Sequence, residues 1–344
     1  MQKEILVAGP LLNEEGHLIE KGYAKSLIRE YKRSDIKANK LKIKEWDYYL
    51  IYDDKYGIAL TYDDNSYMGL KSVSIIDLIN AKEKTVSPMQ FMTRGHHNLP
   101  SSSKYGDCIY HSKKIDILFR HIDGKRVLDV RLSNYHDKKD FECHLILDEE
   151  PQDSMVIVTP FKENPKAFYY NQKIVGFNVE GYFKVGDYQY NFDKNKTRGI
   201  LDWGRGVWTY KNTWYWGAGA GVIDGHEIGF NIGYGFGDTS LASENCIFYD
   251  GVMHKLEEVT FNIPKDEKGK YNYLDKWTFT SSDGRFEMNF TPIIDRKSKT
   301  NVGIICSDQH QIFGKFNGSM ILDDGRIIEV KDFIAFAERV YNKW

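Results

Sequence analysis

The stretch at residues 199–238 constrains the fold of this chain more than any other part of the sequence. It reads GILDWGRGVWTYKNTWYWGAGAG at 199–221 and GFNIGYGFGDTS at 229–240, and it holds four of the seven tryptophans. Glycine packs nothing in a strand and usually marks a bulge, a bend or the close approach of a ligand. We therefore interpret this stretch as strands that form the wall of a site.

Composition and periodicity indicate a mostly β protein. Aromatic residues make up 14% of the 344 residues, with 23 Tyr and 29 Gly, which is typical of half-buried strands and tight turns. Alternating runs recur along the chain. The expected strands lie at 48–54, 56–64, 67–80, 115–134 (a hairpin around an Asp-Gly turn), 141–150, 173–183, 188–192, 257–263, 276–290, 302–308, 311–322 and 326–334.

Two similar halves are predicted. FTSSDGRFEMNF in the second half repeats the strand, Asp-Gly turn and strand pattern of LFRHIDGKRVLDV in the first, which is compatible with two β-barrels in tandem. Pro151, Pro160 and Pro165 punctuate the middle of the chain, so we place a boundary at residue 165, between domains 1–165 and 166–344. The first 44 residues are expected to form an arm, with one or two helical turns near 23–31.

Charge and cysteines exclude several classes of protein. The formal net charge is -2 and the charges are interspersed, so no basic face for nucleic acid is expected. Cys108, Cys143, Cys246 and Cys306 form no CxxC pair, which favours buried free thiols over a zinc site or disulfides. No run is long enough for a signal sequence or a membrane span, so we expect a cytoplasmic protein.

A series of motifs in order identifies a family resemblance. The blocks are RGHHNLP and KEWDYYLIY in the first half, then LDWGRGVW, TWYWGAGAG, GFGDTS with SEN, DGVMHKL, FTPIIDR, QHQIFGKF, LDDGR and AFAERVYNKW. They resemble the bacterial domain-of-unknown-function 2804 family over nearly the whole chain, most densely after residue 198. That family is distantly similar to the carotenoid 1,2-hydratase and AttH-like group, whose relatives include a hydratase, cyclases and lipid-handling proteins.

The resemblance implies an all-β fold of two tandem lipocalin-like antiparallel β-barrels with few short helices. It also bears on the C-terminal segment at 333–344, where the apolar spacing slightly favours a helix; the resemblance implies a closing strand, which we adopt. The distant group's DHEW-type motif has only a partial counterpart in Asp202-Trp203-Gly204, which lacks the His and the Glu.

Asp202 is the first candidate for chemistry. On a strand, Asp202, Gly204, Gly206 and Trp208 share one face. A carboxyl group desolvated inside a barrel has a raised pKa and suits a general acid that protonates an alkene or a leaving oxygen. The alternative is an ion pair with Arg205 or another Arg that pins the strand. The tryptophans likewise form either a flat wall for an apolar ligand or simply core.

Further polar residues complete the predicted site. Asp238 precedes Thr239 and Ser240 and can be a catalytic carboxylate or an Asx turn. The catalytic candidates are Asp202, His310, Glu338, Asp238 and Glu244. The candidate ligand-binding residues are Trp203, Arg205, Trp208, Trp214, Trp216, Asn231, Tyr234, Asn245, His254 and Gln311.

Several site classes are excluded by pattern. The pairs His96-His97 and His226-Glu227 lack metal-ligand spacing, and no HExxH occurs, so no metal is predicted. No dinucleotide loop and no nucleophile elbow are present. We therefore expect no cofactor.

Two functions remain, with a third narrower one. The first is a cofactor-independent acid-base enzyme of the hydratase, lyase, isomerase or cyclase type, acting on an apolar or amphipathic small molecule. The second is a lipocalin-like carrier of a hydrophobic ligand, and the third is a carbohydrate-active enzyme. Acid-base chemistry needs at least two of Asp202, Asp238, Glu244, His310 and Glu338 in one place, whereas a carrier needs only one polar anchor.

Overall fold

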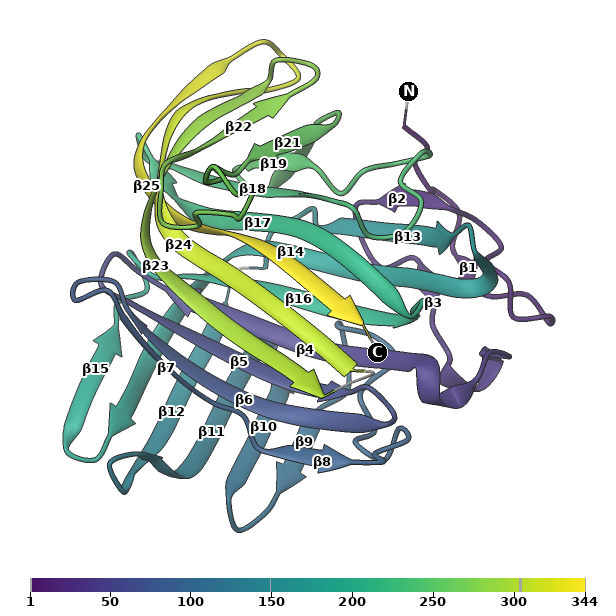
Figure 1. Ribbon diagram of the computed structural model, residues 1–344, viewed down its shortest axis with the longest axis horizontal. Coiled ribbons are helices and arrows are strands. Elements are labelled where there is room, and N and C mark those ends of the chain that lie inside the picture. Colours follow the sequence, from purple (N-terminus) through teal and green to yellow (C-terminus); the bar gives the residue numbers. More distant parts are fainter. Residues whose placement is uncertain (1, 149, 303–304, 344) are drawn as a thin grey trace.

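The computed structural model describes residues 2–148, 150–302 and 305–343 and consists almost entirely of antiparallel strands (Figure 1). The described helices are two 3-10 turns, η1 (Arg33–Asp35) and η2 (Lys40–Lys42). The all-β prediction is therefore confirmed. Within the described part of the chain, no helix has the length and apolar character needed to cross a membrane.

The larger sheet contains fourteen of the described strands. Its main path is β7-β6-β5-β4-β16-β14-β12-β11-β10-β9, with β13 and β15 on β14, β8 on β6 and β2 on β13. The strands are β2 (Gly22–Ala24), β4 (Ile43–Tyr52), β5 (Tyr56–Asp64), β6 (Met68–Asp77), β7 (Lys82–Val86), β8 (Met89–Phe91), β9 (Cys108–His111), β10 (Ile115–Ile122), β11 (Lys125–His136), β12 (Lys139–Asp148), β13 (Met155–Phe161), β14 (Asn164–Val185), β15 (Tyr188–Phe192) and β16 (Arg198–Val207).

The smaller sheet has nine described strands in the order β20-β19-β18-β17-β25-β24-β23-β22-β21. They are β17 (Lys211–Ile223), β18 (His226–Tyr234), β19 (Cys246–Tyr249), β20 (Val252–Lys255), β21 (Val259–Asn262), β22 (Trp277–Ser281), β23 (Phe286–Val302), β24 (Ile305–Ile321) and β25 (Ile327–Lys343). The C-terminal segment is a strand, as the resemblance implied. The strand expected at 302–308 includes residues 303 and 304, which lie outside the described residues.

The arm differs from the prediction. The helical turns expected near 23–31 are wrong, because two short strands lie there: β2 pairs with β13, and β3 (Arg29–Glu30) pairs in parallel with β1 (Gly9–Pro10). The backbone N–H of Tyr23 donates to the carbonyl of Lys3. These long-range backbone bonds take the donors that a helix would use internally.

The chain passes from one sheet to the other at residues 208–210, later than the boundary placed at residue 165. Residue 165 lies in β14, which pairs with β12, β13, β15 and β16 of the larger sheet. Pro160 and Pro165 belong to the hairpin that joins β13 to β14. Proline marks a turn here rather than a linker, because it also suits the ends of strands.

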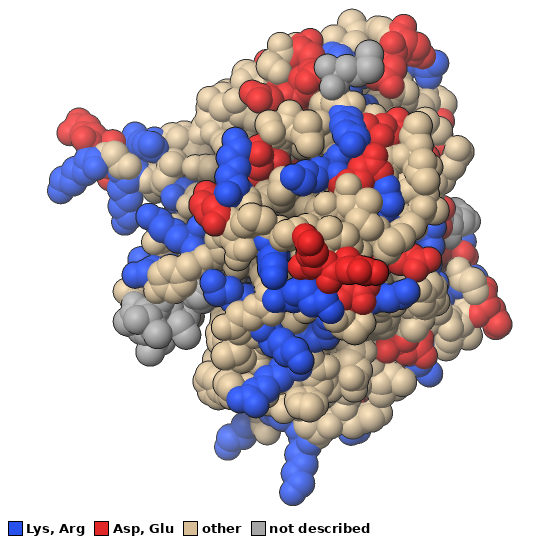
Figure 2. Space-filling view, turned by 90° about the vertical axis from the view of Figure 1, so that its right-hand side faces the viewer, with Lys and Arg blue, Asp and Glu red and all other residues tan. Residues whose placement is uncertain are grey.

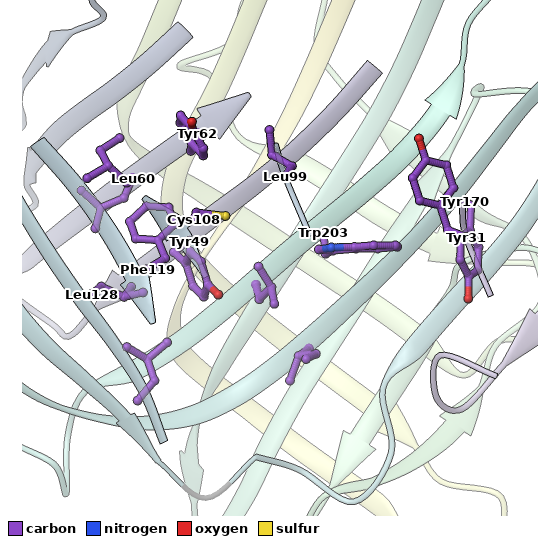
Figure 3. Close-up of a cluster of buried hydrophobic side chains, with 14 of the residues drawn as sticks. Tyr31, Tyr49, Leu60, Tyr62, Leu99, Cys108, Phe119, Leu128, Tyr170 and Trp203 are labelled. Carbon is purple, nitrogen blue, oxygen red and sulfur yellow. The ribbon is translucent and has the colours of Figure 1, made fainter. Parts of the chain in front are cut away.

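Three apolar clusters hold the sheets together. Two lie in the larger and the smaller sheet separately. The third lies between them and joins Leu50 and Tyr52 of β4 to Ala218 of β17 and Phe336 of β25. In the first cluster the fully buried Trp203 contacts the edges of Tyr31 and Tyr170 (Figure 3). The four cysteines are free, and three of them are buried.

The glycines at 199–238 are explained by close packing within the protein. A Cβ atom at Gly204 would lie inside the indole of Trp46, and one at Gly219 would lie 2.5 Å from the Cβ atom of Ala335. Neither position has room for a side chain. The glycine spacing therefore reflects close approach, as predicted, but the approaching atoms at these two positions belong to the protein itself.

Candidate functional site

The candidate site lies between the two sheets, where a row of residues from each sheet meets. Strand pairing places Lys173, Asp202 and Tyr48 side by side across β14, β16 and β4. On the facing sheet it aligns Gly233, Trp216, Glu338, Gln311 and Arg296 across β18, β17, β25, β24 and β23. Tyr48 joins the rows, since its ring contacts Trp216 and its hydroxyl lies 3.3 Å from the Gln311 amide nitrogen.

Lys173 and Asp202 form a buried ion pair. The Lys173 Nζ lies 2.7 Å from Asp202 Oδ1, and the Asn171 amide donates to the same oxygen at 2.6 Å. Lys173 also lies over the Trp216 ring, at 4.0 Å from the centroid. A buried carboxylate without these partners would be costly. The ion pair of Asp202 is thus made with Lys173, and not with Arg205 or another arginine as the alternative had it.

Glu338 is the second carboxyl group of the site. It accepts hydrogen bonds from Trp214 Nε1 at 3.1 Å and from Gln311 Nε2 at 3.1 Å. The Gln311 carbonyl oxygen in turn accepts from Arg296 at 2.8 Å. These contacts orient Glu338 through side chains of three strands.

Glu244 is the third carboxyl group, and it reaches the site from the loop after β18. Asn231 donates to its carboxylate at 3.4 Å and accepts from Trp216 Nε1 at 2.8 Å. A Cβ atom at Gly233 would lie 2.7 Å from Glu244 Oε1. Glycine at this position therefore leaves the room that the carboxylate occupies.

Burial controls the protonation of this site. Desolvation raises the pKa of Glu338 to about 7; the Trp214 hydrogen bond and Lys173 oppose the rise, while Asp202 adds to it. Desolvation also raises the pKa of Glu244, with Lys173 opposing and Asp202 adding. The pKa of Tyr169 is raised by desolvation and then by the charges of Glu244, Asp202 and Glu338. The charge of Asp202 therefore raises the pKa of both Glu338 and Glu244. We call the set Asn171, Lys173, Asp202, Asn231, Glu244, Gln311 and Glu338 the inter-sheet cluster.

An aromatic layer lies beside the cluster, toward residue 208. Trp208 contacts the rings of Trp46, Trp214 and Phe236 at centroid distances of 5.3, 5.7 and 4.7 Å. Tyr169 stacks on Trp46 and places its hydroxyl 3.5 Å from Lys173 Nζ. The apolar third cluster lies on the other side of the polar rows. The space between the sheets is therefore layered as aromatic, polar and apolar.

Solvent reaches the polar and aromatic layers. Asp202, Trp208 and Glu338 are 8%, 8% and 9% exposed, whereas Leu201 and Trp203, on the opposite face of β16, have no exposed surface. Trp46, Trp214 and Glu244 are more exposed still.

Other predicted residues lie outside the cluster. Arg205 is fully buried. It forms an ion pair with Asp47 at 3.0 Å and donates hydrogen bonds to the backbone carbonyls of Trp46 and Pro100. Trp203 shares that face of β16 and belongs to the core. Both therefore lie on the side of β16 that faces away from the site.

The remaining predicted residues have structural contacts. His310 pairs with Asp295 at 2.8 Å and stacks on Tyr273, on the face of β24 opposite Gln311. Asp238 accepts from the Ser240 backbone, the Asx-type alternative, and pairs with Lys162. Tyr234 stacks on Tyr215, and His254 pairs with Asp323. Asn245 accepts a hydrogen bond from the backbone N–H of Gly233.

Sequence reasoning missed several residues of the site, above all Lys173, Asn171, Tyr169, Tyr48 and Arg296. One signal for the first three was present in FYYNQKIVGF, where Tyr169, Asn171 and Lys173 alternate and therefore share one face of the strand. Lysine is almost never fully buried unless it is paired. A lysine on the inner face of a strand therefore indicates a carboxylate partner.

Two cavities with measurable volume lie elsewhere. One of about 350 Å³ is bordered by Tyr62, His97 and Tyr110, and another of about 250 Å³ by Glu150, Asn178 and Phe248. Neither includes a residue of the inter-sheet cluster. Within the described part of the chain, no group of three His, Cys, Asp or Glu side chains is placed to hold a metal ion.

Comparison with known proteins supports the fold. The model of the family Domain of unknown function (DUF2804) matches residues 2–344. The protein assigned as AttH from Nitrosomonas europaea superposes with a TM-score of 0.56 at 12% identity, covering 90% of this chain and 96% of that one. Kievitone hydratase from Nectria haematococca gives 0.47 at 12% identity, covering 91% and 92%. CghA with Sch210972 gives 0.44 at 8% identity, covering 97% of each chain. No curated protein matches by sequence.

Proposed function

This chain belongs to the DUF2804 family, and from that premise we propose that it is an acid-base enzyme of the hydratase, lyase or isomerase type, acting on an apolar or amphipathic small molecule. The observation that supports this most is the meeting of Glu338, Asp202 and Glu244 around Lys173. A carrier needs one polar anchor, whereas this arrangement supplies a proton donor and further carboxyl groups beside it.

Glu338 is the proposed proton donor. A carboxyl group with a pKa of about 7 is protonated in a large fraction of molecules near neutral pH, and it can donate without a large driving force. In a hydration, the Glu338 proton passes to one carbon of an alkene and the π electrons form the new C–H bond. A water oxygen then bonds to the other carbon, and the proton that this water releases passes to Asp202. Elimination is the reverse.

Lys173 and Tyr169 position the reacting groups in this proposal. The Lys173 ammonium fixes the position of Asp202, the proposed proton acceptor, through the contact at 2.7 Å. The Tyr169 hydroxyl stays protonated because its pKa is raised, so it can donate a hydrogen bond to a substrate oxygen. The aromatic layer holds the apolar part of the substrate by flat contact. All these steps use the chain's own side chains.

The test compares small molecules that co-purify with the wild-type protein and with Glu338→Gln, identified by mass spectrometry. We expect Glu338→Gln to retain a molecule that added wild-type protein converts, either by gain or loss of one water or to an isomer with a different retention time. The rate should decline as pH rises through about 7, because Glu338 then loses its proton.

Glu329→Gln is the matched control, since Glu329 is an exposed residue of the same strand. It should behave as the wild type. Recovery of one identical molecule from the wild type and from Glu338→Gln, unconverted by either, would instead identify a carrier. Retained conversion by Glu338→Gln would exclude Glu338 as the donor.

A further inference from the structure

The RGHHNLP motif at 94–100 borders a cavity of about 350 Å³ that the proposed function does not use. The Asp64 carboxylate fixes the start of the motif, since it accepts a hydrogen bond from the backbone N–H of Gly95 at 2.8 Å. Met92 and Arg94 have φ angles of 55° and 50°, in the left-handed region that residues other than glycine rarely adopt. Such strained residues persist only where their surroundings fix them, and they cluster at ligand sites.

Aromatic rings form much of the border of this cavity. Tyr62 and His97 stack with their centroids 5.1 Å apart, and Tyr110 packs its edge against His97 at 5.7 Å. His97 is only 6% exposed, whereas Ile109, which also borders the cavity, is 52% exposed. The cavity therefore extends from buried rings to the surface. Pockets of about 300–1,000 Å³ with aromatic walls and a few polar groups are the usual sites of small ligands.

A buried lysine lies behind these rings. Lys71 of β6 is 1% exposed, and its Nζ lies 2.8 Å from His97 Nε2 and 3.2 Å from Gln90 Oε1. The ammonium also lies over the Tyr110 ring, 3.9 Å from the centroid. His97 Nδ1 donates to the backbone carbonyl of Asp63 at 2.7 Å, so Nε2 accepts from Lys71 and the imidazole is neutral. These partners of the ammonium therefore carry no charge.

The charge of Lys71 lacks a direct counter-charge. In the described part of the chain, Lys71 makes no ion pair with a carboxylate. Desolvation lowers its pKa to about 8, while the charges of Asp63 and Asp64 oppose this, so Lys71 is mostly charged near neutral pH. Desolvation raises the pKa of Asp63 to about 7, which makes its own charge incomplete there.

Other charges do not supply what Lys71 lacks. Asp107 borders the cavity, but it is exposed and accepts from the backbone N–H of His121 at 3.0 Å. Figure 2 shows exposed Lys and Arg interspersed with Asp and Glu on one face of the molecule, whereas Lys71 is buried. A buried charge without a counter-charge is costly. An anion that enters the cavity from the surface would remove this cost.

We propose that this cavity is a second binding site, separate from the inter-sheet cluster, and that it takes a small aromatic carboxylate. The ligand carboxylate replaces the Gln90 carbonyl as a partner of Lys71, since a charged acceptor binds an ammonium more strongly than an amide does. Gln90 borders the cavity and is exposed, so its side chain can rotate away. The ligand ring lies against Tyr110 and Ile109, the apolar part of the border.

The test uses 4-fluorobenzoate and its uncharged analogue 4-fluorobenzamide with the full chain. Binding is measured by the broadening of the ¹⁹F signal as protein is added. We expect the wild type to bind the benzoate about tenfold more tightly than the benzamide. Lys71→Met keeps the length of the side chain without its charge and should bind both probes equally, through loss of benzoate affinity. Lys82→Met, at an exposed position of the neighbouring strand β7, is the matched control and should retain the preference.

A pair of surface variants tests the same site without altering the interior. Ile109→Glu should lower the ratio of benzoate to benzamide affinity about fivefold, and Ile109→Lys should raise it, because the added charges have opposite signs. These variants decide the outcome alone if Lys71→Met does not fold. Absence of benzoate binding, equal wild-type affinity for the two probes, or an unchanged ratio in folded Lys71→Met or in the Ile109 variants would overturn the proposal. None of these results depends on the conversion assay with Glu338→Gln.

Discussion

Glu338 shows at the scale of one residue how burial turns a common side chain into a reactive one. Its strand is long and its neighbours Ala337 and Phe336 are fully buried. The alternation of β25 places Glu338 on the same face as the buried Phe336, and this placement depends only on a period of two. The identity of its partners does not follow from that period, because Trp214 and Gln311 come from other strands.

The raised pKa of Glu338 also predicts a pH-dependent stability. Between the usual value of 4.5 and about 7, the folded protein retains a proton that the unfolded chain has released, so stability falls as pH rises across this window. Glu338→Gln removes this dependence. Relative to the wild type, the variant should gain roughly 2 kcal/mol in free energy of unfolding between pH 5 and pH 8. Urea unfolding at pH 5 and pH 8 measures the free energy of unfolding of each variant, with Glu329→Gln as the control. The same pH dependence in Glu338→Gln and in the wild type would contradict the prediction.

Strand β17 shows at the scale of an element why the chain needs glycine at alternate positions. Gly217, Gly219 and Gly221 each face atoms of a neighbouring strand, and Phe333 of β25 lies against both Gly219 and Gly221. The sequence pattern correctly indicated close approach. Whether a ligand or a neighbouring strand makes that approach depends on the pairing of β17 with β25, which lie more than a hundred residues apart in sequence.

We expect substitution of Gly219 to damage folding more than ligand entry. An added Cβ atom would lie 2.5 Å from Ala335 and 3.0 Å from Phe230 and Phe333, so Gly219→Ala should cost about 1–3 kcal/mol and Gly219→Val more. Gly57→Ala is the matched control in β5, since its nearest neighbour would be 3.4 Å away. Thermal unfolding measures the stability of the Gly219 variants and of Gly57→Ala. Equal stability of the two alanine variants would show that β17 can shift to accommodate the added methyl group.

The whole molecule is held together by the surface at which the sheets meet. Tyr52 of β4 donates to the carbonyl of Ala220 and accepts from its backbone N–H, and Arg296 of β23 donates to Ser74 of β6. The apolar third cluster lies along the same surface. The predicted site is therefore built on the structure that also joins the two halves.

This shared surface predicts that the two sheets unfold together. Phe336→Ala, at a fully buried position against Trp216 and Phe313, should cost about 3–5 kcal/mol and lower the stability of both sheets. In protein labelled with fluorotryptophan, the ¹⁹F signals of Trp203 and Trp277 report on the larger and the smaller sheet. The folded-state signals of the two tryptophans should disappear at the same urea concentration. Val222→Ala, at an exposed position of β17, is the control, and separate transitions would show that the sheets are independent.

The sequence by itself determined the all-β class, the strand form of the glycine-aromatic stretch and the shared strand face of Asp202 and Trp208, because a period of two and turn chemistry are local properties. Tertiary structure alone decided that Lys173, not an arginine, pairs with Asp202, that Glu244 lies near both of them, and that His310 lies elsewhere. Local alternation assigns each side chain to a face of its strand, whereas the neighbour opposite it depends on which strands pair and in what register. The change of sheet at 208–210 was hidden for the same reason, since β16 pairs with β4, far earlier in the chain.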